Sequence, residues 1–305
     1  MRMATLAGAA VLLCLAAPAA EACACGCGVF EVGAGSAMLP AATTSVFLKY
    51  DFLDQDRNWS GTRSAPADDN DDKRVQTGFF TIGGQYRVDE HWAVQIELPV
   101  WDRLFKTDTG SGVGSFRHTA LGDIRLTGSY SWNESGAATG VLFGLKLPSG
   151  DFGYAPFDRD VSIGTGSTDA LLGLYHSGPL SEDGRFVWYG HVLWDKPLAA
   201  QDGYMPGSEF DAAAGFYYAG FALGEVGIAP MLQGLLSARA RDGGIAADRP
   251  DTGYTRLFLS PGLEFSRGAW SLYGSVQFPV YQNVNGNQLV GRRQFSLLLD
   301  YALED

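Results

Sequence analysis

The chain has 305 residues, 46% of them hydrophobic, and a formal net charge of −12 at pH 7. This acidity disfavours nucleic acid as a partner, because nucleic-acid-binding surfaces are basic. After residue 22 no apolar run reaches the ~20 residues that a membrane-spanning helix needs. Glycine nevertheless supplies 40 residues, well above the usual ~7%, and aromatic residues supply 12%, which is unusual for a soluble domain.

The N-terminus has the pattern of a secretory signal peptide. A basic start at Arg2 precedes an apolar run over Met3–Ala17 and the small-x-small sequence Ala20–Ala22. The run is too short to span a bilayer, so we expect residues 1–22 to be removed and the mature chain to begin at Cys23. Because a cysteine follows the cleavage position directly, acylation of Cys23 is a further alternative.

Three cysteines open the predicted mature chain, in a Cys/Gly-rich segment that covers residues 23–43. Cys23, Cys25 and Cys27 could together bind a soft metal ion such as Cu(I) or Zn(II), or two of them could form a disulfide in the oxidising periplasm. No C-x-x-C-H sequence supports haem attachment. We expect no other cofactor, and the segment is either a plug of the lumen or a periplasmic tether.

Twelve segments of the remaining chain, residues 44–305, are β-like. In Trp92–Val100, for example, large apolar residues alternate with alanine, glutamine, glutamate and proline. This two-residue period predicts strands with one apolar and one polar face. The predicted strands are Ser45–Leu53, Thr77–Val88, Trp92–Val100, Asp123–Trp132, Ala138–Leu147, Asp169–Ser177, Phe186–Trp194, Phe210–Leu223, Val226–Ala238, Tyr254–Phe265, Trp270–Val280 and Phe295–Leu303.

The connections between these segments alternate in length. Long ones cover residues 54–73, 104–117, 148–163, 195–207, 239–253 and 282–291, and short ones cover 89–90, 133–136, 178–184, 224–225 and 266–268. This alternation with an even strand count is typical of outer-membrane barrels, whose short turns face the periplasm. A soluble β-sandwich would not explain it. We predict an all-β, transmembrane antiparallel β-barrel of about twelve strands, with both termini periplasmic.

The polar faces of the strands should line the lumen, because charges are unfavourable in hydrocarbon. They carry both signs of charge, so they form either a path that selects a solute or salt bridges that hold the barrel together. His191 and Gln277 lie on the same faces. The candidate lumen and selectivity residues are Lys49, Asp51, Glu97, Asp123, Arg125, Lys146, Asp169, Asp211, Glu264 and Asp300.

An acidic run, Asp68–Asp72, lies in the first long connection. It could resemble a cation site, but it lacks the glycine and the distal glutamate of an EF-hand loop. We interpret it as a solvated acidic loop, which is the usual role of a run of like charges on a surface.

No catalytic arrangement emerges from the sequence. A G-x-S-x-G nucleophile motif is absent. His176 and Ser177 are adjacent, so on a strand their side chains point to opposite faces and cannot form a nucleophile–base pair. We therefore expect that the protein is not an enzyme.

Several phrases of the sequence resemble a known family. Leu121–Leu126 contains a G-D-hydrophobic motif, Gly144–Asp151 reads G-L-K-L-P-S-G-D, and Gly164–Asp169 reads G-T-G-S-T-D. With the sequence between Trp270 and Leu289, they resemble the outer-membrane barrels named for the MetA pathway of phenol degradation. The resemblance covers roughly residues 119–303 and implies a transporter of small, often hydrophobic or aromatic solutes.

Two features depart from that resemblance. The cysteine cluster lies outside the matched phrases, and the chain ends in Glu304 and Asp305 rather than in a terminal aromatic residue. We predict a passive, porin-like outer-membrane channel whose partners are the membrane lipid and a small solute. A second hypothesis is a barrel that does not transport and is instead a metal-responsive or structural partner of a periplasmic protein, through Cys23, Cys25 and Cys27.

Overall fold

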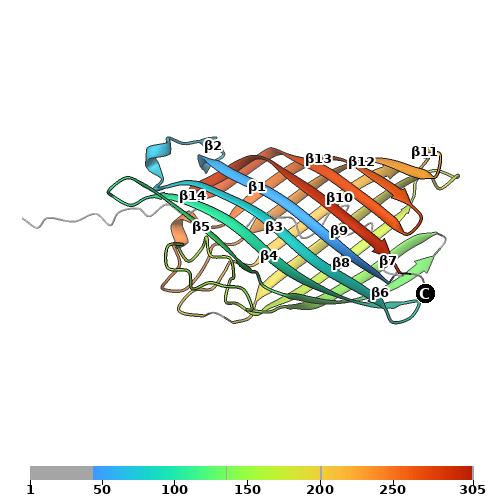
Figure 1. The fold of residues 1–305 in the computed structure, drawn as a ribbon, viewed down its shortest axis with the longest axis horizontal. Helices are drawn as coiled ribbons and strands as arrows, with labels where there is room; N and C mark the ends of the chain where they lie inside the picture. The colour runs from blue at the N-terminus through green and yellow to red at the C-terminus, as the bar shows by residue number, and fades with distance from the viewer. Residues whose placement is uncertain (1–43, 135, 200, 304–305) are drawn as a thin grey trace, which may run out of the picture.

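The computed structural model describes residues 44–134, 136–199 and 201–303, which are mainly β-strand (Figure 1). Two short 3-10 helices, Ala67–Asp69 and Arg249–Asp251, lie between strands, and no helix among the described residues is long and apolar enough to cross a membrane. The strands are β1 (Ser45–Gly61), β2 (Arg63–Ser64), β3 (Asp72–Arg87), β4 (Trp92–Asp108), β5 (Val113–Leu121), β6 (Arg125–Glu134), β7 (Ala137–Lys146), β8 (Asp169–Pro179), β9 (Phe186–Pro197), β10 (Glu209–Tyr218), β11 (Phe221–Leu223), β12 (Val226–Arg239), β13 (Tyr254–Arg267) and β14 (Trp270–Ala302).

The strands form one antiparallel sheet that closes on itself. From β1 through β3, β4, β6, β7, β8, β9 and β10 each wall strand pairs with the next, and β10 then pairs with β12. The ring continues through β13 and β14 back to β1, while β2, β5 and β11 are additions to it. Closure removes the strand edges whose backbone N–H and C=O groups would have no partners in lipid.

Strand β14 crosses the wall twice. At ~3.4 Å per residue its 33 residues would extend about 110 Å, far more than the ~30 Å of a bilayer core. Its first half pairs with β13 and its second half with β1, and the chain reverses at Gly286, where φ is +54°. Ala302 N donates to Ala269 O at 2.8 Å, so the halves lie side by side. The ring of eleven strands therefore makes the twelve crossings that the sequence predicts.

The long and short connections lie at opposite ends of the barrel (Figure 1). The loop end carries residues 62–71, 147–168, 198–208 and 240–253, and the turn end carries the short connections. The strand run begins and ends at the turn end, where Leu303 N donates to Thr44 O at 2.8 Å. The predicted alternation is confirmed, and which side of a membrane each end faces stays a prediction.

Three of the predicted long connections are wrong in extent. Strand β1 continues to Gly61 instead of ending at Leu53, and residues 104–117 mainly form the hairpin of β4 and β5. Residues 282–291 belong to β14 and reverse sharply at Gly286. These stretches pair as strands beyond the apolar part of the wall, where both faces can be polar. The alternation on which the prediction depended is absent there.

The outer face of the barrel is apolar. Alternate wall residues are large hydrophobic side chains with high exposure, from 37% for Leu263 to 61% for Ile82. Near the turn end aromatic rings pair on this surface, and the ring centroids of Trp270 and Tyr301 lie 4.6 Å apart. An apolar band with aromatic residues at its border is the surface that barrels present to a membrane.

Candidate functional site: the barrel lumen

The wall residues between the outward-facing ones point into the lumen. On β12, Met231, Gln233, Leu235, Ser237 and Arg239 are at most 7% exposed, and the residues between them are more exposed. Each of the ten candidate lumen residues is buried or partly buried. The structure gathers some of them into one cluster and leaves others apart.

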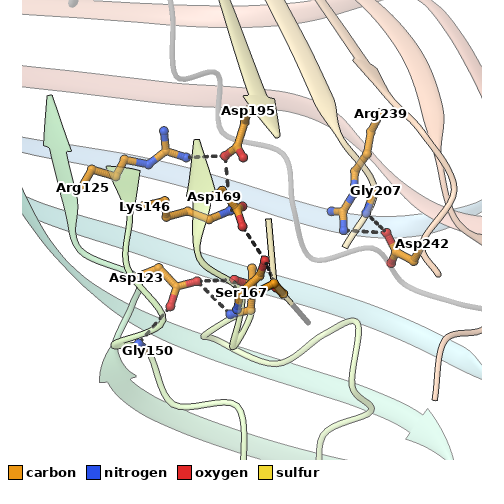
Figure 2. A network of polar contacts seen from close by, with 12 residues as sticks. Asp123, Arg125, Lys146, Gly150, Ser167, Asp169, Asp195, Gly207, Arg239 and Asp242 are labelled. Atoms are coloured by element: carbon orange, nitrogen blue, oxygen red, sulfur yellow. Dashed lines mark hydrogen bonds and ion pairs between the residues drawn. The ribbon is translucent and has the colours of Figure 1, made fainter. Parts of the chain in front are cut away.

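A charged cluster joins the inner faces of β6, β7, β8 and β9 (Figure 2). Lys146 forms an ion pair with Asp169, and its Nζ lies 3.2 Å from Oδ2 of Asp195. Arg125 lies 3.5 Å from the same Asp195 oxygen. Two cations balance two carboxylates, which favours the interpretation that these charges hold the wall together.

Asp195 was missed as a lumen residue, because the predicted strand ended at Trp194. Strand β9 continues to Pro197 and brings Asp195 opposite Leu171 of β8. Asp195 and Lys196 are both charged and Pro197 follows them, so no alternation of apolar and polar residues extended the predicted strand past Trp194.

The other charged candidates lie elsewhere on the inner wall. Lys49 and Asp51 form an ion pair at 3.2 Å on β1, and Ser296 donates to Asp51 at 2.6 Å. Glu97 accepts a hydrogen bond from Gln95 at 2.6 Å. The remaining candidates occupy β10, β13 and the second half of β14: Asp211, Glu264 and Asp300.

Three of the sequence motifs described above meet at one junction in the wall. They are Leu121–Leu126, Gly144–Asp151 and Gly164–Asp169. Asp123, predicted to begin a strand, lies in a break between β5 and β6. Its carboxylate accepts the N–H of Gly150 at 2.9 Å and the N–H and hydroxyl of Thr165 at 2.8 and 2.6 Å (Figure 2). A Cβ at Gly164 would lie 2.3 Å from the backbone of Gly150, so the contact needs glycine. Asp123 therefore closes the base of a loop.

The loop that Asp123 closes, residues 147–168, packs into the barrel at the loop end. Arg103 of β4 is fully buried and donates from Nη1 to the carbonyl oxygens of Val161 at 2.5 Å and Ser162 at 3.1 Å. The loop thus occupies part of the mouth. The apolar side chains of the loop and of the wall form one buried cluster. The loop contributes Phe157, Val161 and Ile163, and strands β3, β4 and β14 contribute Val75, Phe105 and Leu289.

Contacts of loop 147–168 with the neighbouring loops extend over more of the barrel mouth. The guanidinium of Arg159 lies over the rings of Phe152 at 4.7 Å and Tyr204 at 4.5 Å. The Tyr204 hydroxyl donates to Asp242 at 2.7 Å. Asp242 also forms an ion pair with Arg239 at 2.8 Å (Figure 2). Burial lowers the pKa of Arg159 from its ordinary value. Three of the four loop-end connections are therefore linked.

On its outer side loop 147–168 meets the β4–β5 hairpin. Nε2 of His118 lies 2.7 Å from the carboxylate of Asp151, and its ring stacks on Tyr154 with centroids 4.1 Å apart. The pKa of Asp151 is held below its usual range, first by the N–H of Gly153 and then by His118. Loop 147–168 is thus held by Arg103 on its inner side and by His118 on its outer side.

The lumen also contains apolar layers, although the alternation along the strands predicted a polar inner face. Strands β1 and β9 face each other across the ring, yet both contribute to one buried cluster. That cluster contains Phe47, Tyr189, Met231, Tyr273 and Leu298. A second cluster on β8 to β13 contains Leu171, Leu193, Ala213, Leu235 and Phe258. The signal was present in Phe210–Leu223, which is apolar and small on both faces.

The predicted metal site lies outside the described residues, as does the whole of segment 23–43. Cys23, Cys25 and Cys27 therefore stay a prediction. Within residues 44–134, 136–199 and 201–303, no group of three or more His, Cys, Asp or Glu side chains could hold a metal ion.

Comparison with known proteins establishes the fold. No protein-family model and no curated protein matches the sequence. The crystal structure of the COG4313 outer membrane channel from Pseudomonas putida F1 is similar with a TM-score of 0.61 at 14% identity, over 87% of this chain and 97% of that one. The Pseudomonas putida toluene transporter TodX is more distant, with a TM-score of 0.45 at 9% identity over 93% and 96%. The similarity to the first of these two structures shows that the chain has the fold of an outer-membrane β-barrel.

Proposed function

We propose that the protein is an outer-membrane channel through which small apolar or aromatic solutes pass passively. The observation that carries the proposal is the pair of buried apolar clusters on the inner wall. The lumen of a porin for polar solutes is polar. Aliphatic and aromatic lumen side chains instead favour solutes that gain by leaving water.

The orientation is part of the proposal. The loop end faces outward and the turn end, with both termini, faces the periplasm after removal of residues 1–22, as in other barrels with short periplasmic turns. Loop 147–168 then covers the outer mouth. The balanced cluster of Arg125 and Lys146 with Asp169 and Asp195 supports a wall-stabilising role for part of the charged lumen.

The resemblance to the phenol-degradation barrels agrees with this solute class, and no enzymatic step is part of the proposal. The alternative of a metal-responsive barrel rests on Cys23, Cys25 and Cys27, which lie outside the described residues. No contact within the described ranges favours that alternative.

Solute uptake into vesicles tests the proposal. Plain phospholipid already passes apolar solutes, so the vesicles should carry an outer leaflet of lipopolysaccharide and a trapped cyclodextrin that captures the solute. We expect the full chain to accelerate uptake of radiolabelled toluene more than that of a sugar. Uptake equal to that of protein-free vesicles would overturn the proposal.

Two variants connect uptake with the apolar wall. Leu235→Gln places an amide in the second cluster and should reduce toluene uptake. Thr127→Gln adds the same group to the inner face of β6 beside Arg125, and should leave uptake near the wild-type value. Heat-modifiable migration in gels verifies that both variants form barrels. Equal uptake by the two variants would show that the apolar wall does not determine the solute.

A further inference from the structure

His191 of β9 lies within an apolar row of the inner wall. Its partners in the sheet are Tyr175 on β8 and Ala213 on β10. The row continues from Ala213 to Leu235 on β12 and to Phe258 on β13. His191 is thus a polar side chain flanked by aromatic and aliphatic neighbours.

The imidazole of His191 is buried without a hydrogen-bond partner. The residue is 6% exposed, and neither Nδ1 nor Nε2 has a partner among the described residues. The ring of Tyr175 lies nearby with its centroid 6.4 Å away, in edge contact. A buried polar group without a hydrogen-bond partner is unfavourable and rare in native structures, so such a group calls for an explanation.

Other polar side chains near His191 do form hydrogen bonds within the barrel wall. One row nearer the turn end, Tyr189 donates to Gln233 at 2.7 Å, and Gln233 donates to Tyr273 at 3.1 Å. The outward-facing His176 on β8 has the hydroxyl of Thr139 2.8 Å from its Nδ1. Both ring nitrogens of His191 lack a partner, which distinguishes it from Tyr189 on the same strand and from His176 on the neighbouring strand.

The chemistry of the surroundings defines the ligand. A protonated imidazole would be a buried charge beside Leu193 and Leu235, with no carboxylate among its sheet partners, so the neutral ring is favoured. A neutral imidazole offers one N–H donor and one nitrogen acceptor. A pure hydrocarbon would leave both unsatisfied, and a charged solute would find no opposite charge in this row.

We infer that His191 is the polar contact of a lumen binding site for neutral solutes that combine an apolar body with a single hydroxyl or N–H group. The apolar body packs against the second cluster, and the polar group bonds to the imidazole. The inference rests on the proposed function, because the lumen is the route by which a solute reaches His191. It adds that, among apolar solutes, the channel prefers those that carry one hydroxyl or N–H group.

The site can be tested by measuring the binding of two ligands that differ in one hydroxyl group, with variants of one inward-facing and one outward-facing histidine. The full chain in nanodiscs is dialysed against 2-naphthol and against 2-methylnaphthalene, with empty nanodiscs to subtract partition into lipid. We expect His191→Phe to weaken naphthol binding about tenfold, as losing a hydrogen bond in an apolar site does, and to leave methylnaphthalene binding unchanged. His176→Phe, on the outer face, should change neither.

A second measurement uses only the wild-type chain, in case a variant does not fold. With ¹⁵N-labelled histidine, naphthol should shift the ring nitrogens of His191 and not those of His176, and methylnaphthalene should shift neither. If both ligands bind and cross lipopolysaccharide vesicles but His191 responds to neither, the His191 site is wrong and the channel stands. If, instead, toluene uptake equals that of protein-free vesicles, the proposed function fails, and the His191 site fails with it.

Discussion

Arg103 and Val161 join the barrel wall to the loop in its mouth. The fully buried guanidinium of Arg103 donates to the carbonyl oxygen of Val161 at 2.5 Å, and its Nε donates to Thr77 of β3 at 2.9 Å. Arg103 thus connects two wall strands and the loop through one planar group, which an arginine does better than a lysine. The position of loop 147–168 depends on this connection.

Replacing Arg103 should open the mouth. In Arg103→Met the carbonyl oxygens of Val161 and Ser162 lose their donor, at roughly 1–3 kcal/mol for each buried group left unsatisfied. We expect a higher single-channel conductance in planar bilayers. Arg117→Met is the matched control, because its ion pair with Asp102 is exposed to solvent and contributes little to stability. Identical conductance of both variants would contradict the role of Arg103.

The close contact of Gly150 and Gly164 should make the loop base intolerant of a side chain. In Gly164→Ala the new Cβ would lie 2.3 Å from the Gly150 backbone, so the backbone must move. We expect limited proteolysis to cleave loop 147–168 much faster than in the wild type. Gly153→Ala, whose Cβ would have its nearest neighbour at 3.7 Å, is the control and should resist cleavage. Equal resistance of the two variants counts against the junction.

Removing one cation from the charged cluster should destabilise the barrel. Lys146→Met leaves Asp169 and Asp195 with Arg125 as the remaining cation of the cluster, and breaking a buried pair in this way costs about 3–5 kcal/mol. Urea unfolding in vesicles measures the loss. Lys196→Met removes a cation whose hydrogen-bond partner is the neutral Ser208, and it should cost much less. Lys146→Met combined with Asp169→Leu should recover part of the stability.

The outer contact of loop 147–168 should weaken in acid. Because the folded-state pKa of Asp151 is lowered, by Gly153 and then by His118, its contribution is complete at neutral pH. The contribution is lost as pH falls through that lowered pKa. A ¹³C titration of the Asp151 carboxyl group should have its midpoint below 3.8, and the midpoint should rise in His118→Gln. A midpoint of 3.8 or above in the wild type would refute the contact.

The barrel architecture could be predicted from the amino-acid sequence. Alternation along strands such as Trp92–Val100 selects an apolar outer face, and the spacing of turns gives twelve crossings with both ends of the strand run at one end. These features depend on neighbours within a few residues of one another. They could therefore be predicted without knowing which strands meet across the ring.

The contents of the lumen depend instead on contacts between residues that are far apart in the chain. Asp123 was predicted as a lumen charge, yet its carboxylate closes a loop through Gly150 and Thr165, which lie 27 and 42 residues away in the chain. Local periodicity places a residue on the inner face but does not say which side chains it meets there. The same reason hid the solitary His191 and the apolar layer that joins Phe47 to Tyr189, because strands on opposite sides of the ring share no local pattern.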